Sequence, residues 1–294
     1  MGLTGGVMST DRGWPAARAY AISGAGVEAT RTRSLLTRLG KRVLRPGGVQ
    51  LTGWLLEALA IGRDDRVVEL AAGSGVTARL TIARGPASYV GVGLDRSVTA
   101  DLSALARRGT DVRGHRAGAT RTGLPARQAS VVYGEAMLTT RTESVRHRVA
   151  AEAYRLLAPG GRYGIHELCL VPDDIESALA EEIAAALGDS FHAGAFPGTV
   201  PSWHRLLTDA GFAVTAEAIV PMRLLEPSRL IADEGLIGAA SIAVRMLRDA
   251  PARRTVLQMR RVFRRYRRHL AAVALVAVRP GPDAGPADGH LNRS

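Results

Sequence analysis

The spacing of hydrophobic residues changes repeatedly between two periods along the central part of the chain. Short apolar runs typical of buried strands occupy residues 66–71, 88–94, 112–116, 130–133 and 163–170. Segments with helical spacing separate them, at 76–84, 99–108 and 145–157. Strands that alternate with helices in this way predict a parallel sheet with helices on both faces.

The rhythm changes after Pro172. The pattern predicts a helix over 173–187 that Gly188 closes, a helix over 202–210 with Ser202 as its N-cap, and a strand over 212–220. Two further helices, 227–247 and 252–269, precede a last apolar strand over 270–278. We therefore expect an α/β fold with seven strands, an antiparallel last strand, and a helical lid formed by the helices beyond the fifth strand.

Helical spacing also precedes the sheet, from about Tyr20 to Leu59, and both ends of the chain are rich in turn-forming residues. We expect a helical N-terminal extension over 1–60, one domain over 61–280 with lid insertions at about 173–211 and 221–269, and a flexible tail over 281–294.

Composition narrows the class of protein. Of 294 residues, 46% are hydrophobic and 22% charged, the balance of an ordinary globular protein. Cys169 is the single cysteine, which excludes an internal disulfide and a cysteine-based metal site, and we expect no metal. The apolar run 270–278 is too short to span a bilayer, and residues 1–10 lack the pattern of a signal peptide. These features predict a cytoplasmic protein.

Charge raises the question of an anionic partner. The net charge is +12, and such an excess of basic residues can indicate nucleic acid or an anionic membrane as a partner. Lys41 is the only lysine among the 39 basic residues, which favours the alternative that the excess reflects a genome rich in arginine codons. The segment 252–269 places eight arginines within an arc of about 160°, and they are Arg253, Arg254, Arg260, Arg261, Arg264, Arg265, Arg267 and Arg268. An opposite stripe holds Val256, Met259, Phe263, Tyr266 and Leu270.

The plainer interpretation of this segment is a packed helix with a solvated basic face. The more specific interpretation is that this face binds an acidic substrate or the surface of an anionic membrane, so that the protein associates with the membrane peripherally. Aromatic residues make up only 4% of the chain and do not alternate with these arginines, which disfavours a nucleic-acid partner.

The most informative stretch is VVELAAGSG at 67–75, where an apolar strand runs into glycines that open a helix. Such a turn lets the backbone approach a ligand closely. Asp95 follows the second strand, where an acid can accept hydrogen bonds from ribose hydroxyls. The glycine spacing alone also fits a dinucleotide site. Glu69 instead suits a ligand with a cationic end, such as S-adenosylmethionine.

Residues from about 66 to 280 resemble the class I S-adenosylmethionine-dependent methyltransferases, in particular the type grouped with ubiquinone and menaquinone biosynthesis. The motifs that carry the resemblance are VVELAAGSG at 67–75, GVGLDRS at 91–97, SVVYGEAM at 130–137, EAYRLLAPGGRYGIHEL at 152–168 and WHRLLTDAGFAV at 203–214. The resemblance implies a Rossmann-like fold, S-adenosyl-L-methionine as cofactor, and methyl transfer to a small or lipid-like molecule.

The resemblance also implies roles for particular residues. Glu69, Ala71, Gly73 and Gly75 would hold the methionine part, and Asp95 the ribose. Four further residues complete the expected cofactor site, and they are Arg96, Ala119, Thr120 and Tyr133. The chain departs from the family where Gly118-Ala119-Thr120 replaces a Gly-Asp-Ala triplet, because the carboxylate that accepts from the adenine amino group is missing. Ala71 replaces the first motif glycine, and Gly134 replaces an asparagine.

Candidates for catalysis lie beyond the ends of the fourth and fifth strands. Glu135 is the first candidate to touch the methyl acceptor. His166 and Glu167 are neighbours on one strand, so only one of them can face the site. His192 is a candidate on the lid. Cys169 reads as a small buried hydrophobe rather than a nucleophile.

Three other functions remain open from the sequence. The arginine-rich segment would suit a methyltransferase directed at RNA or protein. Ala119 and the lack of an assured base would suit a non-catalytic binding protein with the same fold. A nicotinamide-dependent oxidoreductase fits the glycine spacing but not Glu69 or the antiparallel last strand.

Overall fold

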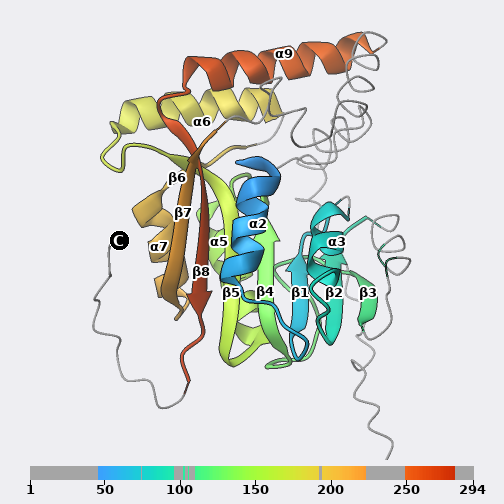
Figure 1. The fold of residues 1–294 in the computed structure, drawn as a ribbon. Coiled ribbons are helices and arrows are strands. Elements are labelled where there is room, and N and C mark those ends of the chain that lie inside the picture. The colour runs from blue at the N-terminus through green and yellow to red at the C-terminus, as the bar shows by residue number, and fades with distance from the viewer. Residues whose placement is uncertain are drawn as a thin grey trace, which may run out of the picture.

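Figure 1 shows the protein, as a computed structural model, with helices on both faces of one central sheet. The structure describes residues 46–73, 75–95, 102, 105, 110–191, 194–222 and 249–281. Several predictions fall wholly or largely outside these residues, namely the first part of the N-terminal extension, the helices over 99–108 and 227–247, and the tail after residue 281.

The sheet follows the predicted plan. Its strand order is β3-β2-β1-β4-β5-β8-β7, and a two-residue strand, β6, pairs with β5. The strands are β1 (Arg66–Leu70), β2 (Ser88–Gly93), β3 (Asp111–Arg116), β4 (Ala129–Glu135), β5 (Leu157–Leu170), β6 (Gly198–Thr199), β7 (Ala213–Pro221) and β8 (Leu270–Val278). Strand β8 is antiparallel to both β5 and β7, and the first five strands pair in parallel. The α/β fold with an antiparallel last strand is thus confirmed.

The helices form layers on either side of this sheet. They are α2 (Gly48–Ala58), α3 (Val76–Ile82), α5 (Glu143–Leu156), α6 (Ser177–Phe191), α7 (Val200–Asp209) and α9 (Ala250–Arg265). One core joins α2 and α3 to one face, through residues such as Leu55 and Val67. A second core joins α5 and α7 to the other face, through residues such as Val68 and Leu156.

A third core lies between α6 and α9, the two helices that Figure 1 shows across one end of the sheet. The predicted apolar stripe of α9 is buried there, since Val256, Met259, Phe263 and Tyr266 are each less than a tenth exposed. Because β8 begins directly after this segment and runs antiparallel to β5, α9 lies at the carboxyl end of the parallel strands.

Strand β5 is longer than predicted. Its first residue, Leu157, pairs with Ala129, and regular pairing with β4 resumes from Arg162. The sequence Pro159-Gly160-Gly161 therefore lies inside the strand, where it interrupts the regular pairing with β4. The backbone of Arg279 holds it by accepting from the N–H of Gly160 at 2.8 Å and donating to the carbonyl of Gly161 at 2.8 Å.

Three predicted helix boundaries were wrong. Gly188 does not end α6, which begins at Ser177 and continues to Phe191. Burial of Leu187 and Ser190 there offsets the cost of a glycine within a helix, about 1 kcal/mol. Helix α7 begins at Val200 with Thr199 as its N-cap, so Ser202 lies in its first turn. Helix α9 ends at Arg265, which leaves Arg267 and Arg268 in the turn before β8.

Candidate active site

The candidate site is built on the loop between β1 and α3. Ala71 and Gly75 both have left-handed backbone conformations, with φ of 54° and 79°, so the chain turns sharply at each of them. A Cβ added at Gly73 would meet no atom within 4 Å, which shows open space beside this part of the loop. Gly75 is the N-cap of α3, and no side chain caps that end of the helix. The loop therefore offers backbone N–H groups to a ligand.

Glu69 lies near the end of β1, just before this loop, and is buried. Its Oε2 atom accepts hydrogen bonds from the hydroxyl groups of Tyr89, at 2.5 Å, and Tyr133, at 2.7 Å. Burial, and then the negative charge of Glu69, raise the pKa of both tyrosine hydroxyl groups, so both stay protonated and donate. Because Tyr133 donates its one proton to Glu69, the hydroxyl of Thr81 donates to Tyr133 across 2.8 Å.

The register of three strands explains this arrangement. Glu69 on β1 lies opposite Gly91 on β2 and Tyr133 on β4. A Cβ at Gly91 would lie 3.3 Å from the Tyr89 hydroxyl oxygen and 2.2 Å from Leu102. The glycine thus leaves the space through which Tyr89 reaches Glu69. Sequence reasoning missed Tyr89, and the signal that could have found it is a tyrosine two residues before a glycine on the neighbouring strand.

The residue predicted to bind the ribose, Asp95, follows the strand next to β1. Asp95 follows the end of β2 and is exposed, at the same edge of the sheet as the loop after β1. Arg96, expected next to it, lies outside the described residues, as does His192.

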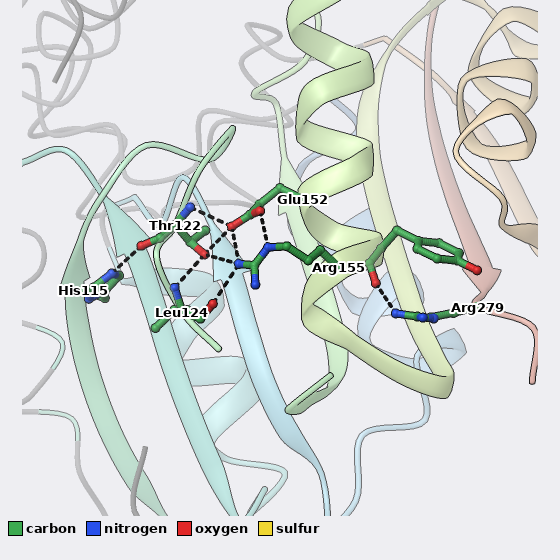
Figure 2. Close-up of polar contacts among 7 residues, drawn as sticks. His115, Thr122, Leu124, Glu152, Arg155 and Arg279 are labelled. Atoms are coloured by element: carbon green, nitrogen blue, oxygen red, sulfur yellow. Dashed lines mark hydrogen bonds and ion pairs between the residues drawn. The ribbon is translucent and has the colours of Figure 1, made fainter. Parts of the chain in front are cut away.

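The segment after β3 carries Ala119 and Thr120 and is fixed at both ends. At its start, the N–H of Ala117 donates to the carbonyl of Gly93 at 3.1 Å. At its end, the carboxylate of Glu152 on α5 accepts from the N–H and the hydroxyl of Thr122, at 2.7 and 2.5 Å (Figure 2). Ala119 itself is half-buried and offers only backbone groups.

Arg155 completes this cluster, as Figure 2 shows. Its guanidinium group donates to both oxygens of Glu152 at 2.7 Å and to the carbonyl of Leu124 at 2.8 Å. Burial raises the pKa of Glu152, but the hydrogen bonds from Arg155 and Thr122 outweigh it, and the pKa lies below its ordinary value. The segment that carries Ala119 and Thr120 is therefore held at its end by an ionised glutamate.

Glu135 and His166 meet at the ends of β4 and β5. Oε1 of Glu135 lies 2.8 Å from Nδ1 of His166 and accepts from the hydroxyl of Thr52 at 2.6 Å, while Oε2 accepts from the hydroxyl of Thr77 at 2.6 Å. His166 is fully buried, and its Nε2 contacts the carbonyl oxygen of Pro46. The pair thus links two strands to α2 and to the first turn of α3.

His166 and Glu167 point to opposite faces of β5. Glu167 accepts from the backbone N–H groups of Met137, Leu138 and Thr139 at 2.7 to 3.0 Å, so it holds the turn that follows β4. His204 lies 2.6 Å from Glu217 at the surface. Within the described part of the chain, no three or more His, Cys, Asp or Glu side chains are grouped to hold a metal ion.

These residues fit S-adenosylmethionine. A buried carboxylate comes just before a loop that offers backbone N–H groups, open space borders Gly73, and a second carboxylate follows the next strand. This donor and acceptor set matches a ligand with a cationic amino acid end and a ribose.

Comparisons with known proteins find a methyltransferase domain in this part of the chain. A family model described as a methyltransferase domain matches residues 67–161, which include the loop, Asp95 and Glu135. An uncharacterised protein of Haemophilus influenzae is 30% identical over 237 residues, a match that covers 79% of this chain and 90% of that protein.

Solved structures share the fold at low sequence identity. A provisionally assigned sarcosine dimethylglycine methyltransferase from Galdieria sulphuraria matches with a TM-score of 0.64 and 12% identity, over 85% of this chain and 98% of that one. Phosphoethanolamine N-methyltransferase 2 of Haemonchus contortus, solved with S-adenosyl-L-methionine, matches with a TM-score of 0.63 and 14% identity, over 86% of this chain and 57% of that one. Residues 67–161 of this protein therefore match a methyltransferase domain, and the chain has the fold of solved methyltransferases, one of which holds S-adenosyl-L-methionine.

Proposed function

We propose that the protein transfers a methyl group from S-adenosylmethionine to a small or lipid-like molecule by in-line displacement. The observation that carries the proposal is the sharp turn of the chain at Ala71 and again at Gly75, directly after the buried Glu69 and at the same edge of the sheet as Asp95. The two solved relatives support a small acceptor, since their names refer to sarcosine, dimethylglycine and phosphoethanolamine.

In this proposal the chain holds the cofactor at three places. Glu69, Ala71, Gly73 and Gly75 bind the methionine part, and Asp95 with Arg96 binds the ribose. Ala119, Thr120 and Tyr133 complete the site, with Tyr133 acting through Glu69. When bound, S-adenosylmethionine supplies an electrophilic methyl group, so the residues mainly align the two reactants and exclude water.

Glu135, His166 and His192 are our candidates for the acceptor side. The contacts of Glu135 and His166 support a positioning role, because their polar atoms already bond to Thr52, Thr77 and Pro46. The pair would keep α2 and the first turn of α3 in place at the ends of β4 and β5. A base is needed only for an acceptor that loses a proton on methylation.

Calorimetric titration tests the proposal. Purified full-length protein is titrated with S-adenosylmethionine, S-adenosylhomocysteine and NADH, and so is the Asp95→Ala variant. We expect both sulfur nucleosides, and not NADH, to bind with micromolar affinity. Loss of charge-assisted hydrogen bonds to the ribose should weaken binding in the variant by about tenfold or more. Asp64→Ala is the matched control, since it removes an exposed carboxylate from the opposite end of β1.

The other outcomes separate the alternatives. If neither sulfur nucleoside binds to a folded sample, the protein is a non-catalytic relative, as the replacement of a carboxylate by Ala119 would favour. Binding of NADH alone would indicate an oxidoreductase. If both nucleosides bind, an acceptor screen that includes RNA and protein distinguishes the small-molecule proposal from a methyltransferase directed at macromolecules.

A further inference from the structure

One face of α9 carries many arginines and no acidic residue. The buried stripe of the helix packs on α6, so the opposite side faces outward, and Arg254, Arg261, Arg264 and Arg265 are exposed there. Arg267 and Arg268 extend the exposed basic surface into the turn that follows. No aspartate or glutamate occurs between residues 250 and 269. We call the exposed residues Arg254, Leu257, Arg261, Arg264, Arg265 and Arg268 the basic face.

The neighbouring helix neutralises little of this charge. Glu182 on α6 pairs with Arg265 at 2.7 Å, and both side chains are largely exposed to solvent. Within the described residues, Arg254, Arg261, Arg264 and Arg268 make no ion pair. Exposed cations of this density are stabilised by an anionic partner and attract one over several ångströms of water.

An apolar side chain lies in the middle of the basic face. Leu257 is 44% exposed, one of the few large hydrophobic side chains so exposed among the described residues. It lies three residues after Arg254 and four before Arg261, on the same side of the helix. The aromatic side chains here, Phe263 on the helix and Tyr266 directly after it, are buried against α6.

We propose that the basic face binds the surface of an anionic membrane. Exposed arginines around one protruding leucine match a lipid surface, where the cations contact headgroups and the leucine enters the boundary with the acyl chains. A single-stranded nucleic acid would need exposed aromatic side chains on which its bases could stack, and those of α9 are buried. No helix among the described residues combines the length and the apolar character needed to cross a bilayer, so the contact would be peripheral.

The position of α9 gives such binding a consequence for the candidate site. Figure 1 shows α9 and α6 across the end of the sheet toward which the parallel strands run, the end that carries the candidate site. A membrane at the basic face would therefore lie at the end of the molecule where a lipid-like acceptor would enter. This consequence rests on the proposed function, whereas binding to membranes does not.

Co-sedimentation of the full chain with vesicles tests the proposal without cofactor or acceptor. The vesicles contain phosphatidylcholine alone or an equal mixture with phosphatidylglycerol, at low and at high salt. We expect binding to the mixed vesicles at low salt, weaker binding at high salt, and none to phosphatidylcholine. Replacing Arg254, Arg261 and Arg264 together by glutamine should weaken binding about a hundredfold.

The matched control replaces Arg63, Arg148 and Arg205 by glutamine, which removes the same charge from exposed positions on other elements. Equal weakening in both triple variants would overturn the proposal, because net charge alone would explain it. Absence of binding to mixed vesicles at low salt would overturn it as well. Thermal unfolding of each variant checks that the fold persists.

Leu257→Ser separates a membrane from other polyanions. The variant removes no charge, and we expect it to weaken vesicle binding about fivefold at either salt concentration. Retention of the protein on a single-stranded RNA, with no binding to vesicles and no effect of Leu257→Ser, would replace the membrane by a nucleic acid. Since no arm measures methyl transfer, failure here leaves the proposed function intact.

Discussion

Glu69 shows how one side chain under a glycine loop can carry charge without losing its hydrogen bonds. Its two tyrosine donors are neutral, so they hold the carboxylate in place without neutralising its negative charge. We predict that Glu69→Gln weakens the binding of S-adenosylmethionine at least tenfold, because a charge-assisted contact is worth about 1.5–3 kcal/mol. Calorimetric titration measures this change.

Tyr89→Phe is the matched control for that prediction. The substitution removes one donor to Glu69 and keeps its charge, so we expect a loss of about 1 kcal/mol in the free energy of unfolding and little change in affinity. Equal weakening of ligand binding in the two variants would contradict a role for the charge of Glu69.

The Glu135 and His166 pair gives a second prediction for single residues. Glu135→Gln should lower the free energy of unfolding by about 2–3 kcal/mol, because it leaves the buried His166 without its charged partner. Thr52→Val removes one donor to the same carboxylate and should cost about 1 kcal/mol. Denaturant titrations of the single and double variants measure the coupling, and strictly additive effects would show that α2 is not held through Glu135.

At the scale of elements, α5 stabilises the segment after β3 through the ionised Glu152. Because its pKa is lowered in the folded state, its contribution is complete above the ordinary range of glutamate and is lost as the pH falls through the folded value. We predict that Glu152→Gln costs about 2 kcal/mol near neutral pH, and that the difference from the unmodified protein narrows in acid.

Denaturant unfolding at a series of pH values measures that difference. Glu143→Gln serves as the control, because this carboxylate lies at the start of the same helix with its side chain 88% exposed. We expect Glu143→Gln to change stability little at any pH. If the difference in the free energy of unfolding between Glu152→Gln and the unmodified protein stays constant as the pH falls, the charge of Glu152 contributes nothing to stability.

Helix α2 crosses β5 at close range. A Cβ at Gly164 would lie 2.9 Å from Leu55 and 3.0 Å from Leu59, so Gly164→Ala should cost about 1–3 kcal/mol through overpacking. At Gly53, on the same helix, an added Cβ meets nothing within 4 Å, and Gly53→Ala should stabilise the protein by about 0.5–1 kcal/mol. Thermal unfolding of the two variants compares them, and a shift in the same direction would contradict the close approach.

The strand plan could be predicted from the sequence because each buried strand is an apolar run between turn-forming residues. The last strand, 270–278, was predicted to the residue. The prediction that Gly188 ends a helix was wrong because the packing of α6 on α9 decides where that helix ends. For the site, spacing indicates Glu69 and Asp95, which lie at strand ends. It could not reveal that Thr52 and Thr77 bond to Glu135, since 83 and 58 residues separate the partners along the chain.

For the molecule as a whole, the reactivity of the Cys169 thiol is a probe of global unfolding. Its thiol is fully buried on β5, and burial, followed by the negative charges of Asp173 and Glu217, raises its pKa to about 12. We predict that a thiol-specific reagent modifies the native protein only when the core opens. S-adenosylmethionine at a hundred times its dissociation constant should then slow the modification about a hundredfold. An unchanged rate would show that Cys169 reacts through local opening or that the ligand does not bind.

The insertion of β8 between β5 and β7 has a consequence for how the protein is made. Until Leu270 to Val278 have left the ribosome, β5 and β7 both lack the neighbour that pairs with their backbone groups. A nascent chain in that condition exposes two open sheet edges, which favour aggregation. The order of synthesis therefore delays a complete sheet until the last strand arrives, and we expect the growing polypeptide to depend on chaperones until then.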